Sequence, residues 1–137
     1  MDLIYSFDPA KLDFAKIHAW LTGTYWSPGI TRERVEKGFH ASTVVIGCYT
    51  MDGTQIGVAR CLSDTTRFAY FADVFVADGW RGHGIARSMV ERIIAHPELA
   101  GVENQYLFTQ DAHGVYERIG FGQYLHPERL MHRCKTD

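Results

Sequence analysis

The segment Val76–Arg87 has the residue types and the spacing of an anion-binding turn. It reads Val-Ala-Asp-Gly-Trp-Arg-Gly-His-Gly-Ile-Ala-Arg and joins an expected strand to an expected helix. The first amides of a helix have no partner within the helix, and the helix dipole adds partial positive charge beside them. Gly82 and Gly84 carry no side chain that would keep a ligand from the backbone. The turn therefore predicts a phosphate site, where Arg81 either orients the turn or contacts a phosphate oxygen.

Two common phosphate-binding motifs do not fit this turn. The dinucleotide fingerprint GxGxxG requires glycine where Arg87 stands, and the P-loop requires a final Gly-Lys-Ser/Thr that is absent. Both motifs also belong to parallel sheets, whereas an expected hairpin meander precedes this turn. We therefore reject both motifs.

Two other side chains could take part in proton transfer. Tyr116 lies on the apolar face of an expected helix, and a phenol with a pKa of about 10 can act as an acid. A tyrosine packed in the core would give the same pattern. Asp73 lies between apolar neighbours on an expected strand, so it should face a cleft or a partner. A catalytic base, a substrate anchor and a structural ion pair all remain open for Asp73.

The elements that position these residues form an α+β pattern. Asp8-Pro9 predicts a helix start, Asp52-Gly53 predicts a hairpin, and Gly120 suits the left-handed position after a helix. Asp111 is interpreted as the N-cap of the last helix and His113 as a solvated side chain. We expect strands at 3–7, 43–50, 55–62, 67–77, 105–109, 121–125 and 129–134, and helices at about 9–22, 31–39, 84–95 and 111–119. This order predicts a single domain over residues 1–137 with a mixed sheet.

Composition narrows the classes of function. The formal charge is −2, with 16 acidic and 14 basic residues mixed along the chain, so no basic surface for nucleic acid is expected. Apolar runs fall short of the ~20 residues that span a bilayer, and the N-terminus does not resemble a signal peptide. The cytoplasm is therefore the expected location. Three cysteines and seven histidines form no metal-binding spacing, so no metal is expected and the thiols should be buried or half-buried.

The sequence resembles the GNAT acetyltransferases. Their signature, Gln/Arg-x-x-Gly-x-Gly/Ala, follows a long strand and opens a helix, and Arg81-x-x-Gly84-x-Ala86 matches every specified position. Farther along, Tyr116-Glu-Arg-Ile-Gly-Phe121 matches the family's Tyr-x-x-x-Gly-Phe. The expected order of elements is also similar over nearly the whole chain. Each motif alone is weak, but the two in this order form a strong signal.

The resemblance implies a GNAT fold, with a mostly antiparallel sheet, helices on both faces and splayed strands around acetyl-CoA. It implies direct attack of an amine on the thioester, without a metal or a covalent enzyme intermediate. Tyr116 would protonate the leaving thiolate, and Tyr25 and Trp26 would line the acceptor pocket unless they pack on the core. The backbone at Val74, Phe75 and Val76 would bind pantetheine, and the turn would bind the pyrophosphate through Gly82, His83, Gly84, Ile85, Ala86 and Arg87.

Some details depart from the family pattern. The segment Gln110–Val115 is shorter than in many relatives, which often place a cofactor-binding Asn there; Thr109 or Asp111 could replace it. The acidic base of some relatives has no clear match, although Tyr70 falls near its position and Asp73 lies three residues on. A non-catalytic acyl-CoA sensor or partner-binding module, and an enzyme for longer acyl-CoA, stay as alternatives. A small amine is the expected acceptor, with no nucleic-acid or membrane partner, and a homodimer is left open.

Overall fold

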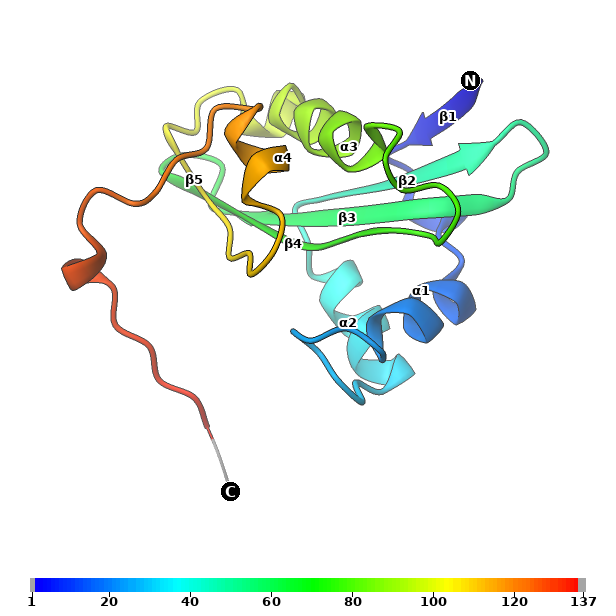
Figure 1. Ribbon diagram of the computed structural model, residues 1–137, viewed down its shortest axis with the longest axis horizontal. Helices are drawn as coiled ribbons and strands as arrows, with labels where there is room; N and C mark the ends of the chain where they lie inside the picture. Colours follow the sequence, from blue (N-terminus) through cyan, green and yellow to red (C-terminus); the bar gives the residue numbers. More distant parts are fainter. Residues whose placement is uncertain (1, 136–137) are drawn as a thin grey trace.

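The computed structural model describes residues 2–135 and has a five-stranded mixed sheet (Figure 1). Its strands are β1 (Leu3–Ser6), β2 (Val44–Thr50), β3 (Gln55–Ser63), β4 (Phe68–Val76) and β5 (Asn104–Tyr106), and they lie side by side in sequence order. The first four strands pair antiparallel, and β5 pairs parallel to β4. The expected α+β class and mostly antiparallel sheet are therefore confirmed.

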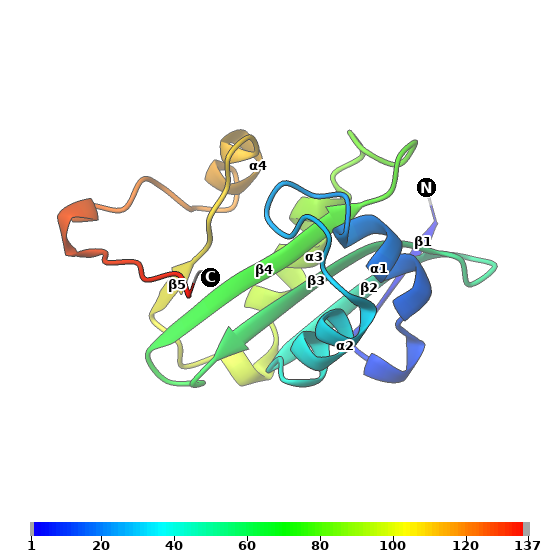
Figure 2. The same ribbon diagram turned by 90° about the horizontal axis from the view of Figure 1, so that it is seen from below.

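Helices cover both faces of this sheet, as expected (Figures 1 and 2). On one face lie α1 (Phe14–Leu21) and α2 (Arg32–His40), and on the other lie α3 (Ile85–Ile94) and the short α4 (His113–Glu117). Short 3-10 helices occur at η1 (Pro9–Lys11), η2 (Pro97–Leu99) and η3 (Pro127–Arg129).

Each helical layer packs on its own hydrophobic core. Side chains alternate between the two faces of a strand, so Val58 of β3 joins the α1–α2 core while its neighbour Ala59 joins the α3 core. Both residues are fully buried. The sheet is therefore a rigid middle layer that fixes the edge of β4 and the start of α3 relative to each other.

The strands β4 and β5 separate after a short stretch of pairing. Only Phe68, Ala69 and Tyr70 of β4 have partners in β5, and β4 then continues to Val76 beside β3 alone. β5 is also shorter than the expected strand at 105–109, because the chain leaves the sheet after Tyr106. This separation confirms the expected splay and leaves part of one edge of β4 without a neighbouring strand.

A β-bulge bends β4 where the strands separate. Val58 pairs with Phe75 and Arg60 with Ala72, so two residues of β4, Asp73 and Val74, lie opposite one residue of β3. Asp73 has a φ of +55°, in the left-handed region that aspartate tolerates better than most residues. A bulge re-aims side chains and locally increases strand twist, so Asp73 occupies a position that a regular strand would not provide.

The first predicted helix, at 9–22, is in fact two elements. Asp8 caps only the 3-10 helix Pro9–Lys11, as its carboxylate accepts from the Ala10 amide. Asp13 then caps α1 by accepting from the Lys16 amide, while its own amide donates to Gln55 Oε1 at 2.8 Å. This contact between segments 42 residues apart fixes the break.

The prediction for the last helix is also wrong in detail. Asp111 does not cap it; the Ala112 amide instead donates to Thr109 Oγ1 at 3.0 Å, and α4 spans only His113–Glu117. Gly120 has the expected left-handed conformation, with a φ of +112°. The helix is therefore shorter than the expected 111–119, and it begins after Ala112 without a side-chain cap.

The two predicted C-terminal strands, 121–125 and 129–134, are absent from the described residues, where this segment is irregular apart from η3. Their sequence pattern suits a strand, but a strand forms only beside a partner. Of the three thiols, Cys48 and Cys61 are buried as expected, whereas Cys134 is exposed. Within residues 2–135, no helix is both long enough and apolar enough to cross a bilayer.

Candidate functional site

A cleft of about 1170 Å³ opens where β5 leaves β4. All seven residues Tyr70–Val76 line it, although the side chains of a strand alternate between its faces. The cleft therefore follows the edge of β4 and reaches its backbone. Its other walls come from the loop after α1, the turn and start of α3, the chain between β5 and α4, and α4 itself. The lining residues on these walls are 23–27, 30, 80–82, 84–87, 107–112, 115, 116 and 118, with Arg60 of β3.

The N-terminus of α3 forms one end of the cleft. Gly84 is the N-cap residue, with a φ of +76°, and no side chain caps the helix. Gly82 has a φ of +82°, and a Cβ at either glycine would meet no atom within 4 Å. The glycines thus supply backbone conformations that other residues rarely adopt, and they leave the first amides of α3 open to a ligand. This geometry suits an anion.

Arg81 orients the turn that leads into α3. Its Nε donates to the carbonyl oxygen of Val76 at 3.0 Å, and its Nη1 lies 3.2 Å from Asp78 Oδ1. The guanidinium also lies 5.3 Å from the centre of the Phe75 ring. Of the two roles that the sequence allowed for Arg81, these contacts support the first, because they join the end of β4 to the turn.

Asp73 lies in the cleft wall with both carboxylate oxygens engaged. Arg60 Nε donates to one oxygen at 2.7 Å, and Trp26 Nε1 donates to the other at 2.9 Å. The Asp73 and Arg60 side chains are only 12% and 18% exposed, so this ion pair is largely shielded from water. Arg60 is held in turn by Gly38 and Ser42. Among the three roles left open for Asp73, this geometry favours the structural ion pair.

Tyr25 and Trp26 belong to the cleft and not to the core. They are 49% and 42% exposed, and their rings meet edge to face at 5.0 Å. The hydroxyl of Tyr25 accepts from the Gln110 amide at 2.8 Å, across 85 residues of sequence. This contact links the loop after α1 to the segment before α4, so the two walls of the cleft are tied together at this point.

Tyr116 lies in the same cleft, on α4. It is 9% exposed, and its ring packs edge to face against Phe121 at 6.0 Å. Burial, reinforced by the nearby Tyr25 and Asp111, raises the pKa of Tyr116 to about 12. The phenol is therefore protonated at neutral pH and available as a proton donor.

Most of the residues predicted for the site lie together in this cleft. Arg81, Tyr70 and Asp111 line it too, whereas His83 and His113 are exposed and lie outside the lining. Sequence reasoning missed Arg60, whose only signal was that it is the one charged residue of its strand. It also missed further lining residues, among them Trp80, Leu107, Phe108, Gln110, Val115 and Arg118.

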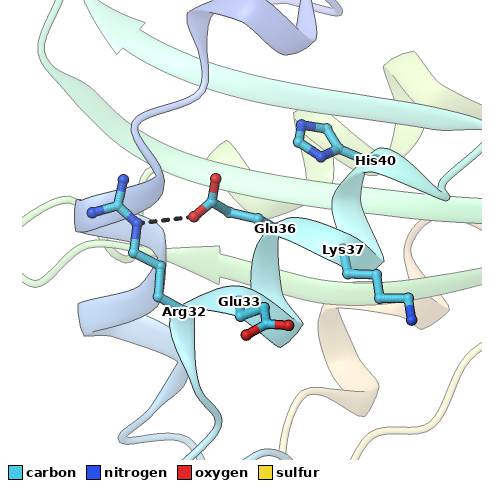
Figure 3. Close-up of a pocket in the computed structure, with 5 residues that line it drawn as sticks. All are labelled: Arg32, Glu33, Glu36, Lys37 and His40. Atoms are coloured by element: carbon cyan, nitrogen blue, oxygen red, sulfur yellow. Dashed lines mark hydrogen bonds and ion pairs between the residues drawn. The ribbon is translucent and has the colours of Figure 1, made fainter.

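A second concavity, of about 630 Å³, lies on the outer face of α2 (Figure 3). It is lined by Arg32, Glu33, Glu36, Lys37 and His40, all from this one helix. Arg32 and Glu36 form an exposed ion pair at 3.0 Å, one helical turn apart. Charges spaced this way are common on a solvated helix face, and no other element contributes to the concavity. We assign it no site.

The comparisons with known proteins agree with this fold and cleft. Residues 42–123, more than half of the chain, match the acetyltransferase (GNAT) domain. A crystal structure of a GNAT-family protein from Xanthomonas campestris pv. campestris is 37% identical, with a TM-score of 0.92 over 98% of this chain and 94% of that one. The splayed sheet and the uncapped helix define a fold of the acetyltransferase class. This chain belongs to the GNAT acetyltransferase family.

More distant structures share the fold. A protein from Deinococcus radiodurans R1, assigned as an acetyltransferase, is 25% identical with a TM-score of 0.73, covering 90% of this chain and 84% of that one. Glucosamine-6-phosphate N-acetyltransferase from Arabidopsis thaliana is 15% identical with a TM-score of 0.67, covering 99% of each chain. At that identity the likeness concerns the fold alone. No curated protein matches the sequence.

Proposed function

We propose that this protein is an N-acetyltransferase that uses acetyl-CoA and acetylates the primary amine of a small molecule. One observation carries the proposal: a single cleft joins the uncapped N-terminus of α3, the free edge of β4 and the buried phenol of Tyr116. These are the three groups that a phosphate, an amide-containing arm and a departing thiolate require. Family membership supports acetyl transfer in general.

The donor would lie along β4, with its phosphates at α3. The amides of residues 82–87 would bind the pyrophosphate, since the helix dipole favours negative charge there. The backbone at Val74, Phe75 and Val76 would bind pantetheine as an added strand would, because this part of the β4 edge has no pairing with β5. A backbone amide near the bulge would polarise the thioester carbonyl.

Transfer would then need only one enzyme side chain in direct contact with the reacting atoms. The ammonium form of the amine first loses a proton to water. The neutral nitrogen then attacks the thioester carbonyl, so a carbon–nitrogen bond forms and the carbon–sulfur bond breaks. Tyr116 gives its proton to the departing sulfur, and the nitrogen loses a proton to water. The buried phenol then recovers a proton from solvent. All bonds and protons of the transfer are accounted for without a covalent enzyme intermediate.

The acceptor side of the cleft is aromatic. Tyr25, Trp26 and Phe108 are exposed there, and Tyr70 packs against Phe108 at 6.0 Å. Aromatic faces attract organic ammonium groups, which is the form in which most amines arrive at neutral pH. The carboxylate of Asp73 is already neutralised by Arg60, so aromatic contact and not an ion pair with Asp73 would hold the amine. This wall supports a small amine as acceptor.

The test is a panel of small primary amines incubated with acetyl-CoA and the protein. We expect at least one amine to become acetylated at a rate that depends on the protein. Acetylated product is measured by mass spectrometry, because the exposed Cys134 would react with thiol reagents. If acetyl-CoA binds but no amine is acetylated, the non-catalytic sensor replaces the enzyme. If longer acyl-CoA donors alone react, the donor assignment changes and the chemistry stays.

A further inference from the structure

A series of hydrogen bonds runs from the C-terminal end of α2 to the aromatic side of the cleft. Arg60 Nη1 donates to the carbonyl oxygen of Gly38 and to Ser42 Oγ, each at 3.4 Å. Arg60 Nε donates to one oxygen of Asp73, and the other oxygen accepts from Trp26 Nε1. The series therefore links α2, β3, β4 and the loop after α1.

The β-bulge brings Asp73 to the face of the sheet where Arg60 lies. Ala69 and Phe71 of β4 pack in the core beside α3, so regular alternation would turn Asp73 to that face as well. Arg60 lies on the opposite face, which α1 and α2 cover, with its guanidinium 5.6 Å from the centre of the Phe39 ring (Figure 1). The extra residue of the bulge reverses the alternation, and Asp73 therefore meets Arg60.

The ion pair between Arg60 and Asp73 does little for stability by itself. The two side chains are 18% and 12% exposed, and the cost of desolvating two charges offsets most of their attraction. The positive φ of Asp73 adds strain, and strain of this kind concentrates at functional sites. What the pair supplies is a fixed carboxylate oxygen, and that oxygen accepts from the indole of Trp26 at 2.9 Å.

Trp26 is an exposed ring that is held at one end. The residue is 42% exposed and lines the cleft, yet its N–H is bound to a carboxylate that is shielded from water. Exposed side chains without such a contact change rotamer within picoseconds to nanoseconds. The ring of Tyr25 meets the indole edge to face, with 86° between the two planes. The orientation of this aromatic wall therefore depends on a hydrogen bond made below its surface.

We propose that Arg60 is a positioning residue of the acceptor site: through the Asp73 carboxylate it holds the indole of Trp26 in the orientation that binds the amine. The inference rests on the proposed function, because it takes the aromatic wall as the acceptor side of the cleft. A ring that is already fixed loses little freedom when the amine binds, whereas ordering a free ring weakens binding roughly three- to tenfold. Arg60 thus acts on the amine without touching it, and the donor end at α3 does not depend on it.

Two variants break the series at different points. Asparagine in place of Asp73 has the same shape and tolerates the same φ, but it has one acceptor oxygen where two donors converge. Arg60 keeps that oxygen, because a charged donor makes the stronger hydrogen bond, so Asp73→Asn releases Trp26. Arg60→Gln removes the cation that fixes the carboxylate. Arg32→Gln is the matched control, since Arg32 also pairs with a carboxylate, Glu36, but does not line the cleft.

The indole N–H signals of the three tryptophans, in a proton–nitrogen correlation spectrum of the isotope-labelled protein, measure the positioning directly. The Trp26 signal is the one that disappears in Trp26→Phe. We expect its exchange with water to be about tenfold or more faster in Asp73→Asn and Arg60→Gln, with no change in Arg32→Gln or in the other two signals. A Trp26 signal that exchanges equally slowly in Asp73→Asn overturns the proposal, even where Arg60→Gln does not fold.

Benzylamine, a primary amine with a flat apolar ring, is the probe for the acceptor side. We expect it to shift the Trp26 signal, with a Kd roughly three- to tenfold higher in Asp73→Asn and Arg60→Gln, while the Kd for acetyl-CoA measured by calorimetry stays the same. The proposal is overturned if benzylamine leaves the Trp26 signal in place, if its Kd is equal in all variants, or if both ligands weaken alike. These measurements need no turnover, so a protein that binds benzylamine in this way but acetylates no amine refutes the proposed function alone.

Discussion

Burial decides what the phenol of Tyr116 can do. Its pKa of about 12 keeps the proton in place at neutral pH, but it also makes the phenol a weaker acid than a free thiol with a pKa of about 8.5. A thiolate that departs into the same buried cleft is affected in the same direction. The buried thiol of Cys61 illustrates the size of this effect, since burial raises its pKa to about 11. Burial of the departing thiolate in the cleft would therefore narrow the difference between the two pKa values.

Replacing Tyr116 by phenylalanine should lower kcat far more than it weakens donor binding. A positioned general acid contributes about 10²- to 10⁴-fold, and phenylalanine keeps the ring that packs on Phe121. We expect a loss of that size in kcat, with a nearly unchanged Kd for acetyl-CoA. Steady-state kinetics and calorimetry on the same preparations give the two quantities.

The control for this variant is Tyr5→Phe, since Tyr5 is also partly buried but lies on β1, at the opposite edge of the sheet. It should keep full activity. Equal activity in Tyr116→Phe and Tyr5→Phe would remove Tyr116 from the mechanism.

The pH dependence of kcat follows from the raised pKa of Tyr116. Because Tyr116 stays protonated, kcat should not fall through loss of its proton up to about pH 10.

The partners of Asp73 illustrate what the sequence leaves open at this scale. The pattern predicted a charged residue that needs a partner, because an unpaired buried charge is costly. Its two partners, Arg60 and Trp26, lie 13 and 47 residues away. Which of several charged and aromatic residues meets Asp73 depends on the β3–β4 register and on the bulge, and neither follows from residue spacing.

At the scale of elements, the N-terminus of α3 carries the donor site. Its glycines could be predicted, because the turn between an expected strand and an expected helix needed residues that allow a close approach to the backbone. The structure adds that Gly79, Gly82 and Gly84 all have positive φ, between +76° and +84°. Only Gly82 and Gly84 line the cleft. Substitutions at these glycines can therefore separate the effect of backbone strain from the effect of a blocked ligand site.

Gly84→Asp should abolish acetyl-CoA binding. The new carboxylate would occupy the first amides of α3 and repel a phosphate, so we expect the Kd to rise by a hundredfold or more, as for a loss of about 2.7 kcal/mol. Gly79→Asp is the control, with a similar φ and open space but a place outside the cleft. Both variants should lose comparable stability in thermal unfolding. Equal donor affinity in the two variants would contradict a phosphate site at α3.

The elements with a regular apolar period were predicted well, and those set by distant contacts were not. The meander strands and α2, which begins after its Thr31 cap, lie close to their expected positions. The break before α1 escaped prediction because Asp13 interacts with Gln55 on β3. The C-terminal strands were predicted from their pattern, but a pattern does not supply the neighbouring strand that would pair with them.

At the scale of the whole molecule, the cleft results from the topology of the sheet. β4 pairs with β3 over its length, and β5 accompanies it only from Phe68 to Tyr70. The cleft lies in the resulting gap, and the loop after α1 reaches the segment before α4 across it through Tyr25 and Gln110. The splayed sheet was predicted because the order of elements resembles that of the GNAT family. The Tyr25 contact could not be predicted, because nothing in the local sequence links these two loops.

Titration of the unchanged protein with acetyl-CoA by calorimetry tests the central claim, that this cleft is a donor site. We expect one acetyl-CoA per chain and a rise in Tm, since a ligand bound only to the folded state adds about 2.7 kcal/mol at a hundredfold excess over Kd. Free adenine or acetate at the same concentration should give no binding heat and no rise in Tm, because these two molecules are too short to span the cleft from α3 to Tyr116. Absence of both heat and Tm shift at millimolar acetyl-CoA would contradict the account.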